Sequence, residues 1–300
     1  MTVIDLPSKF IQTIISVHGK AGEKWLAGLD ELIAYCKNKW QFELVPPKKL
    51  SYSFVAPVKF PDGGKAILKL CVPSTGINSE IAVLRSFNNV GYCRLIDTEP
   101  DKGIMLLEQI EPGTTLTHIK DEAIAVTIIS DLIIEMHRSN PVVNYPFQTA
   151  DDWYDDLLAL QKRFGNNDFP ESLFSNAVAA YQSVKSNPQQ QRLLHGDLHQ
   201  ENILLSGNGK YKAIDPKGII AETGCELIPF LTNIPLKRDI SSIFDKCISI
   251  FSNKLEIDKE RIIKWGAFRS VLSVYWKIED NLPVTKDDIA MCRLFNETGI

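Results

Sequence analysis

The sequence lacks most of the features that would place it in a specialised class of protein. None of its six cysteines forms a Cys-x-x-Cys pair, and no group of cysteines and histidines has the spacing of a zinc site. The most apolar helical stretch, residues 123–134, is short and contains Asp131, so we expect no membrane span. The first ten residues lack the basic-then-apolar order of a signal peptide. We therefore expect reduced thiols and a cytoplasmic protein.

The charge balance excludes a further class. The chain has 33 lysines and arginines against 37 aspartates and glutamates, which gives a net charge of -4. A general nucleic-acid binder depends on an excess of cationic side chains, so we expect neither nucleic acid nor a membrane as a partner. The charge leaves the oligomeric state open. The 300 residues, of which 44% are hydrophobic, are enough for a buried core in one or two domains.

The first part of the chain combines helices with strands. Helical spacing of apolar residues predicts one helix from Ser8 and a second over residues 22–39. A turn at residues 61–64 then joins two runs that predict a β-hairpin. The predicted strands cover residues 42–50 (an edge strand), 50–58, 65–71, 93–98 and 103–110, with a helix over residues 78–88.

The sequence Glu111-Pro112-Gly113 interrupts this pattern and predicts a domain boundary. Beyond it the chain is mostly helical, with predicted helices over residues 121–138, 151–164 and 172–185 and from Cys225 onward, and one small hairpin at residues 203–205 and 211–214. We expect an α+β fold with two lobes. The smaller lobe comprises residues 1–110, with a helical extension over residues 1–40, and the larger lobe comprises residues 111–300.

One polar segment stands apart in the larger lobe. It begins with His195-Gly196-Asp197 and reaches Asn202, five residues after Asp197. The small hairpin follows at once and ends at Asp215. This layout resembles the catalytic loop of protein kinases. In those enzymes the first Asp accepts a hydroxyl proton, while the Asn and the later Asp bind Mg²⁺.

The same residue types also occur in loops for structural reasons, because Asp and Asn cap helices and close turns. The coincidence of polar loop, spacing, apolar hairpin and second Asp favours the catalytic interpretation. Mg²⁺ prefers hard oxygen ligands, and Asn202 and Asp215 would supply them. We expect His195 to brace the loop through hydrogen bonds, and we expect neither His195 nor His199 to be catalytic.

A kinase-like loop requires a lysine and a glutamate in the smaller lobe. Lys69 lies in an apolar strand, and Glu80 follows eleven residues later in a predicted helix. A buried lysine needs a counter-charge, which phosphates and Glu80 would provide. The alternative is that Lys69 lies on an exposed strand face and Glu80 on a helix surface. The order of these residues before Asp197 favours pairing.

The expected glycine-rich phosphate loop is missing. Ser51 and Ser53 lie in its place, and their hydroxyl and backbone N–H groups would bind phosphate oxygens. The strand that ends with Glu108 and Ile110 would place its backbone against the edge of the adenine base. These four residues complete the predicted nucleotide site with Lys69 and Glu80.

Several segments resemble one known group of small-molecule kinases, the aminoglycoside phosphotransferase superfamily, whose loop has the His-Gly-Asp form found at residues 195–197. Within it the chain looks most like the streptomycin 6-kinase and hydroxyurea kinase branch. That resemblance is carried by residues 22–26 with Trp40, residues 107–113, residues 214–218 (Ile-Asp-Pro-Lys-Gly) and residues 269–276. It spans nearly the whole chain.

The resemblance implies a two-lobed protein-kinase-like fold with a small antiparallel sheet in the N-lobe. It implies that Asp197 is the catalytic base, that Asn202 and Asp215 bind Mg²⁺, and that Lys69 contacts phosphates while Glu80 orients it. Two departures separate this chain from the branch pattern. Glu226 stands where an Asp is usual, and Glu201 stands where a different residue is common. The identity of the acceptor therefore does not follow from the resemblance.

The acceptor would contact acidic side chains if it is a cationic antibiotic. Asp151, Asp152 and Asp155 lie along one side of a predicted helix, and Glu222 and Glu226 are further candidates. The alternative for the aspartates is that acidic residues are favoured in a first helical turn. Trp153, Arg269 and Trp276 are looser candidates, with Trp276 also compatible with a place in the core.

The sequence as a whole predicts a kinase that uses ATP or GTP with Mg²⁺ and phosphorylates a hydroxyl of an aminoglycoside-like acceptor. No Ala-Pro-Glu sequence follows Asp215, and helical pattern resumes within about ten residues, which favours a small acceptor over a peptide. One alternative is a metabolic kinase for a sugar, a choline-like alcohol or hydroxyurea. Another is a nucleotide-binding pseudokinase, against which the intact catalytic set argues.

Overall fold

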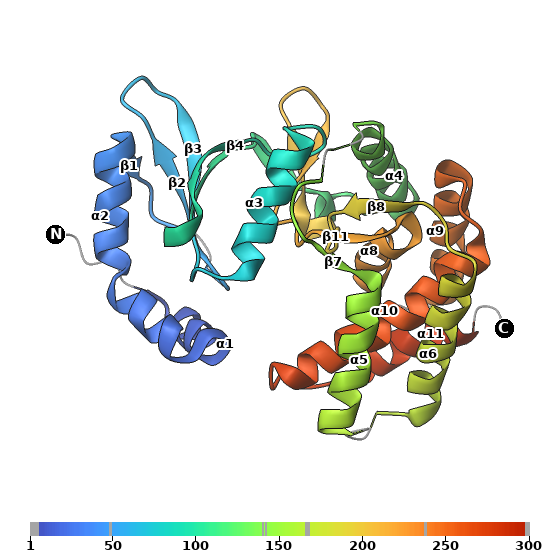
Figure 1. The fold of residues 1–300 in the computed structure, drawn as a ribbon. Helices are drawn as coiled ribbons and strands as arrows, with labels where there is room; N and C mark the ends of the chain where they lie inside the picture. The colour runs from blue at the N-terminus through green and yellow to red at the C-terminus, as the bar shows by residue number, and fades with distance from the viewer. Residues whose placement is uncertain are drawn as a thin grey trace.

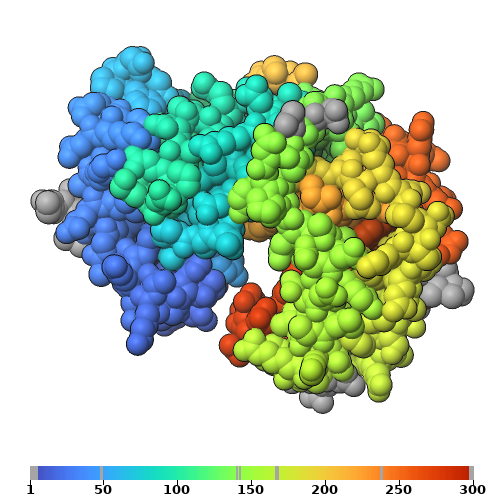
Figure 2. All heavy atoms as spheres, viewed as in Figure 1, coloured from blue at the N-terminus to red at the C-terminus, as the bar shows by residue number. Residues whose placement is uncertain are grey.

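A computed structural model describes residues 6–47, 50–139, 141, 143–165, 169–236 and 239–297. A sheet flanked by helices forms the first part of the chain, and a larger, mostly helical part follows (Figure 1). This arrangement confirms the predicted α+β class. The space-filling view shows an opening between the N-terminal helices and the far ends of the C-terminal helices (Figure 2).

Two helices cover one face of the sheet. Helix α1 spans Ser8–Ala27 and α2 spans Leu29–Trp40, so the break between them falls at Gly28, later than the sequence predicted. Gly19 has a positive φ of 55° inside α1 and kinks it. A Cβ atom at Gly22 would lie 2.5 Å from the carbonyl oxygen of Ile14, so only glycine fits where α1 folds back on itself. No helix of the described residues is long and apolar enough to cross a membrane.

The sheet has five antiparallel strands in the order β1-β2-β3-β5-β4. The prediction of an edge strand before the hairpin is confirmed, although β1 is only two residues long. The hairpin is confirmed as well, with its second strand pairing Lys69 with Val55 on one side and Met105 on the other. The strands are β1 (Glu43–Leu44), β2 (Phe54–Lys59), β3 (Lys65–Leu70), β4 (Leu95–Glu99) and β5 (Ile104–Glu108).

Side chains along β3 alternate between the two faces of the sheet. Ala66, Leu68 and Leu70 are fully buried against the core that α1 and α2 share with the sheet. Because successive side chains in a strand point to opposite faces, Lys69 lies on the other face. Helix α3 (Thr75–Phe87) packs there and carries Glu80 toward it.

The larger part contains long helices and two three-stranded sheets. Figure 1 shows the long helices grouped on the side away from α1 and α2. The helices are α4 (Glu122–Arg138), α5 (Ala150–Phe164), α6 (Glu171–Ser186), α7 (Thr223–Glu226), α8 (Ile228–Thr232), α9 (Ile240–Leu255), α10 (Lys259–Glu279) and α11 (Lys286–Glu297). The sheets have the orders β10-β9-β6 and β7-β11-β8, formed by β6 (Pro112–Thr115), β7 (Gln148–Thr149), β8 (Gln191–Leu194), β9 (Ile203–Ser206), β10 (Tyr211–Ala213) and β11 (Ile219–Glu222).

The hydrophobic core consists of two clusters that do not coincide with the predicted lobes. One cluster joins α1 and α2 to the outer face of the sheet. The other contains Ile81 and Leu84 of α3 and Met105 of β5, together with residues of α4 to α11 such as Phe268. The inner face of the sheet and α3 therefore share a core with the helical part, and the division at residue 110 stays a prediction.

Candidate active site

Backbone pairing holds the polar segment at both ends. β8 runs antiparallel to β11, with Leu194 opposite Ile219, so that the N–H groups of Lys217 and Gly218 donate to the carbonyl of His195 at 2.8 and 3.0 Å. At the other end, the N–H of Ile214 donates to the carbonyl of Asn202 at 2.9 Å. These contacts bring residues 195–202 and 214–218 side by side.

The ring of His195 fills the space beneath this loop. It is fully buried and stacks on Tyr92 with ring centroids 5.8 Å apart. Its Nδ1 accepts the N–H of Asp197 at 3.2 Å, so the proton of the neutral ring lies on Nε2, which donates to the carbonyl of Ile214 at 2.8 Å. Burial lowers the pKa of His195 to about 4, which keeps the ring neutral. The predicted bracing role is confirmed.

Two buried charged side chains grip the backbone of the loop. The carboxylate of Glu226 accepts the N–H groups of His195 and Gly196 at 2.7 and 2.9 Å. The guanidinium of Arg269 donates to the carbonyl of Gly196 at 3.0 Å, and it lies over the ring of Trp153, 4.0 Å from its centroid. Burial raises the pKa of Glu226 to about 7. Gly196 has a φ of 82°, so glycine is the residue that suits this turn.

The carboxylate of Asp197 faces an open pocket. Its side chain is 37% exposed, and the nearest basic atom is Nε2 of His199 at 3.9 Å. The carbonyl of Asp197 accepts a hydrogen bond from Nδ2 of Asn202 at 3.0 Å. That bond holds the amide group of Asn202 against the backbone of Asp197, so the positions of the two side chains are fixed relative to each other.

Lys69, Glu80 and Asp215 form one charged group. Nζ of Lys69 lies 2.8 Å from both carboxylate oxygens of Glu80 and 2.8 Å from Oδ1 of Asp215. Lys69 and Glu80 are buried, whereas the side chain of Asp215 is 42% exposed. Asp215 has a φ of 58°, an uncommon value for a residue with a side chain. The structure thus brings together three residues that are up to 146 positions apart.

Mutual attraction keeps this group ionised. Burial favours the neutral form of Lys69, but the carboxylates of Glu80 and Asp215 outweigh burial and hold the pKa of Lys69 above its ordinary value. Burial also acts on Asp215, and Lys69 outweighs it, so that the pKa of Asp215 lies below its ordinary value. Burial raises the pKa of Glu80, whose charge depends on Lys69.

The residues predicted to bind Mg²⁺ have suitable oxygen atoms. In the described part of the chain, neither Oδ2 of Asp215 nor Oδ1 of Asn202 has a hydrogen-bond partner. Two hard oxygen ligands are what Mg²⁺ takes from a protein when nucleotide phosphates and water complete its shell. The same described residues contain no group of three or more His, Cys, Asp or Glu side chains that could hold a metal without such help.

The other predicted nucleotide residues have varied surroundings. Ser51 is exposed, and Ser53 accepts a hydrogen bond from the thiol of Cys71 at 3.2 Å. The carboxylate of Glu108 accepts a hydrogen bond from Nζ of Lys212 at 2.7 Å, which connects the end of β5 to β10. Ile110 is buried in the larger cluster. Glu108 and Ile110 thus occupy the connection between the sheet and the helical part.

None of the five acidic residues predicted to bind the acceptor lines the pocket beside Asp197. Asp151 pairs with Lys185 at 2.6 Å, and Asp152 closes a capping box with Thr149 at the start of α5. Asp155 is exposed to solvent. Glu222 is buried with Arg261 at 2.7 Å, and Glu226 holds the loop as described above. The capping alternative therefore accounts for Asp152.

The pocket beside Asp197 has a volume of about 440 Å³. Its walls come from the loop, from α5, from α8 and from α10, which contribute Trp153, Thr232, Arg269 and Trp276. Trp276 lies at the surface of this pocket as well as packing edge-on against Trp153, with ring centroids 5.4 Å apart. The pocket is within the size range of small-molecule sites.

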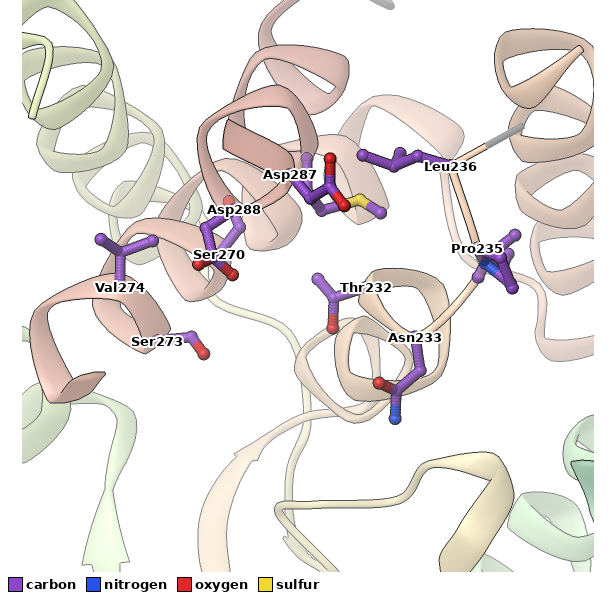
Figure 3. A pocket seen from close by; sticks show the side chains of 11 residues that line it. Thr232, Asn233, Pro235, Leu236, Ser270, Ser273, Val274, Asp287 and Asp288 are labelled. Atoms are coloured by element: carbon purple, nitrogen blue, oxygen red, sulfur yellow. The ribbon is translucent and has the colours of Figure 1, made fainter. Parts of the chain in front are cut away.

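Two further pockets adjoin it. One of about 400 Å³ shares Glu201 and Asn233 with the first and extends toward α4. The other, of about 230 Å³, shares Thr232, Asn233 and Ser273 with the first and is lined on one side by α11. Figure 3 shows this pocket of about 230 Å³, with the carboxylate of Asp287 directed into it. Because the three pockets share lining residues, we refer to them together as the groove.

Sequence reasoning missed several residues of this groove. Lys217 lines the first pocket and belongs to the Ile-Asp-Pro-Lys-Gly segment at residues 214–218, in which only Asp215 was predicted to have a role. Thr232, Asn233 and Asp287 carry no motif, because α8, α10 and α11 come together only in the folded chain. Every residue of α10 from Trp265 to Leu272 is buried, so apolar spacing does not indicate which of its faces meets the pocket.

Named relatives resemble almost the full length of the chain. Streptomycin 6-kinase of Streptomyces griseus is 26% identical over 286 residues, covering 93% of this chain and 92% of the relative. Hydroxyurea phosphotransferase of Kitasatospora aureofaciens is 27% identical over 283 residues, covering 93% of this chain and 82% of the relative.

Solved structures share the fold. A choline/ethanolamine kinase family protein from Mesorhizobium loti superposes with a TM-score of 0.69 at 14% identity, covering 90% of this chain and 95% of that protein. A thermostable mutant of an aminoglycoside phosphotransferase, solved in a ternary complex with ADP and hygromycin B, gives a TM-score of 0.62 at 13% identity over 89% of this chain and 99% of that one. The fold is the two-lobed protein-kinase-like fold that the sequence predicted.

A family model supplies the assignment. The model described as aminoglycoside/hydroxyurea antibiotic resistance kinase matches residues 41–281, a span that includes the Lys69 group, the loop of Asp197 and the pocket beside it. The match confirms the predicted superfamily and branch. The chain therefore belongs to the aminoglycoside/hydroxyurea antibiotic resistance kinase family.

Proposed function

We propose that this kinase transfers the γ-phosphoryl group of ATP or GTP to a hydroxyl group of a small acceptor held in the groove beside Asp197. The observation that carries the proposal is the position of the groove. It begins at the carboxylate of Asp197. Lys69 pairs with Asp215, and Lys217, two residues after Asp215, lines the groove.

The residues divide into two functions. Lys69, oriented by Glu80, would bind the phosphates, and Asn202 with Asp215 would hold Mg²⁺, which neutralises phosphate charge when bound. Asp197 would orient the acceptor hydroxyl and take its proton as the new oxygen–phosphorus bond forms. Ser51, Ser53, Glu108 and Ile110 remain proposed contacts of the nucleotide. In this scheme the protein mainly positions the reacting groups and stabilises the negative charge of the phosphates.

For the acceptor we propose an aminoglycoside-like compound, as the named relatives suggest. Besides Asp197 the groove has further acidic groups, with Glu201 in the first pocket and Asp287 in the pocket lined by α11. Hydroxyurea is the second candidate, because one relative carries that name and the first pocket is balanced in charge. In that pocket Asp197 and Glu201 are opposed by Lys217 and Arg269.

A panel of acceptors tests this proposal. Purified protein with Mg²⁺ and labelled ATP or GTP is given streptomycin, other aminoglycosides, hydroxyurea, choline and simple sugars, and phosphorylated product is detected by mass spectrometry. We expect one aminoglycoside or hydroxyurea to be phosphorylated. Transfer to choline or a sugar alone would favour the metabolic alternative, and tight nucleotide binding without any transfer would favour a pseudokinase. The six cysteines are all free, so we propose the reducing cytoplasm as the site of action.

A further inference from the structure

Lys217 occupies a position that the proposed reaction does not yet use. It lies two residues after Asp215 in the loop between β10 and β11, and it lines the same pocket as Asp197. A Cβ atom built on Gly196 would lie 3.5 Å from Cβ of Lys217, so the lysine side chain leaves the backbone beside the residue that precedes Asp197.

The backbone of Lys217 is fixed on both sides. Its N–H donates to the carbonyl of His195 at 2.8 Å, and its carbonyl accepts the hydroxyl of Ser79 on α3 at 2.5 Å. The next residue, Gly218, has a φ of 76°, and a Cβ atom there would lie 2.7 Å from both Phe147 and Val83. The position of Lys217 is therefore set by the catalytic loop and by α3 together.

The ammonium group itself is uncommitted. The hydrogen bonds of Lys217 in the described part of the chain involve its backbone alone, and no ion pair there includes its Nζ. The neighbouring cations differ in this respect. Lys69 is neutralised by Glu80 and Asp215, and Arg269 is stacked on Trp153 and hydrogen-bonded to the loop.

Phosphoryl transfer is favoured by a cation beside the group that is transferred. As the acceptor oxygen bonds to the γ-phosphorus, the bond from phosphorus to the β–γ bridging oxygen breaks, and the nucleoside diphosphate leaves with that electron pair. The hydroxyl proton goes to Asp197. Negative charge spreads over the three oxygens of the phosphoryl group in transit, and an added cation stabilises that state.

Building on the proposed function, we propose that the ammonium group of Lys217 contacts the phosphoryl group in transit and neutralises its charge. Lys217→Met removes the charge while keeping the length, and Lys217→Arg keeps a cation. Lys210→Met is the control, because Lys210 is an exposed residue of the β9–β10 turn outside the groove. We expect kcat to fall about 100-fold in Lys217→Met, with the KM of the acceptor and the Kd of the nucleotide little changed.

A lysine that merely bound the acceptor would raise KM and leave kcat intact, and that result would overturn the proposal. So would equal kcat values for Lys217→Met and Lys210→Met. A second measurement uses binding of Mg²⁺, ADP and fluoroaluminate, a planar mimic of the phosphoryl group in transit. We expect fluoroaluminate to tighten ADP binding in the unmodified protein and in Lys210→Met, weakly in Lys217→Arg, and not in Lys217→Met.

The two proposals can fail separately. If no acceptor is phosphorylated by the unmodified protein, the proposed function fails, and the role of Lys217 is judged from the fluoroaluminate measurement. Equal fluoroaluminate binding by the unmodified protein and Lys217→Met, or none by either, would then overturn it. If an acceptor is phosphorylated equally well without the lysine charge, the proposed function stands and the assignment of Lys217 falls.

Discussion

Nζ of Lys69 lies 2.8 Å from Oδ1 of Asp215, which joins the sheet of the small lobe to the loop that ends the β9–β10 hairpin. The same ammonium group is bound by Glu80. Replacing Lys69 by Met would leave the buried carboxylate of Glu80 without its counter-charge, so we expect the free energy of unfolding to fall by about 3 kcal/mol and turnover to be lost. Urea denaturation measures the first effect.

Lys65→Met is the control for that experiment, since Lys65 lies in the same strand and pairs with Glu111 at the surface. We expect its effect to stay below about 1 kcal/mol, because exposed ion pairs contribute little. Equal losses in the two variants would contradict the assignment of a buried charged group to Lys69.

Asp197→Asn keeps the shape of the side chain and removes its ability to accept a proton. We expect kcat to fall at least about 100-fold while the Kd of the Mg²⁺–nucleotide complex is unchanged, because Asp197 is assigned to the acceptor hydroxyl. Steady-state kinetics and calorimetric titration with a non-hydrolysable nucleotide separate the two. Asp155→Asn, on the exposed side of α5, is the matched control and should retain full activity. Turnover that survives in Asp197→Asn would mean that another group takes the proton.

Glu226 should give stability an unusual dependence on pH. Burial raises its pKa from 4.5 to about 7, so the folded protein binds this proton more tightly than the unfolded chain does. The resulting stabilisation is complete below the unfolded pKa and is lost as pH rises through about 7. Relative to Glu226→Gln, the unmodified protein should lose about 3 kcal/mol over that interval. Urea denaturation across the interval measures the difference.

His195 supplies a comparison of opposite sign. Its pKa falls from 6.5 to about 4 on burial, so its contribution is present above 6.5 and lost as pH falls through about 4. Relative to His195→Gln, the unmodified protein should therefore become less stable in acid. For Glu226, the prediction is contradicted if the unmodified protein does not lose stability relative to Glu226→Gln as pH rises, because Glu226 would then be ionised throughout.

Asp287 should affect cationic acceptors alone. Its carboxylate points into the pocket that α11 lines (Figure 3), and no ion pair within the described residues engages it. We expect Asp287→Asn to raise the KM of a cationic acceptor about fivefold and to leave kcat unchanged, as the loss of one partly exposed charge pair would. The KM of hydroxyurea should not change. Asp280→Asn, at the end of α10, is the control.

The sequence predicted those parts of the site that chain order and spacing define. Asp197, Asn202 and Asp215 are fixed by a loop and a hairpin that are local in sequence, and Lys69 and Glu80 are fixed by a strand followed by a helix. A helix with long apolar periodicity, such as α4, was predicted for the same reason. β6, β7, β8 and β11 were missed because strands of two to four residues show no periodicity.

The acceptor groove was predicted only in part, because it depends on how distant helices face one another. The looser candidates Trp153, Arg269 and Trp276 line its first pocket, whereas the acidic candidates do not. α5 illustrates this. Its first turn presents Asp151 and Asp152 to solvent, while Trp153 turns inward and lines the pocket. Spacing placed the aspartates on one side of the helix, but it carried no information about which side meets α10.

The core that α3 shares with the helical part makes the two lobes a single cooperative unit at that contact. A fragment ending at the Glu111–Pro112 junction would keep the cluster beneath α1 and α2, yet it would expose to water the apolar face of α3 formed by Ile77, Ile81 and Leu84. Glu80 extends from that same helix. Packing against the large lobe therefore holds α3, and with it Glu80, in the position that orients Lys69.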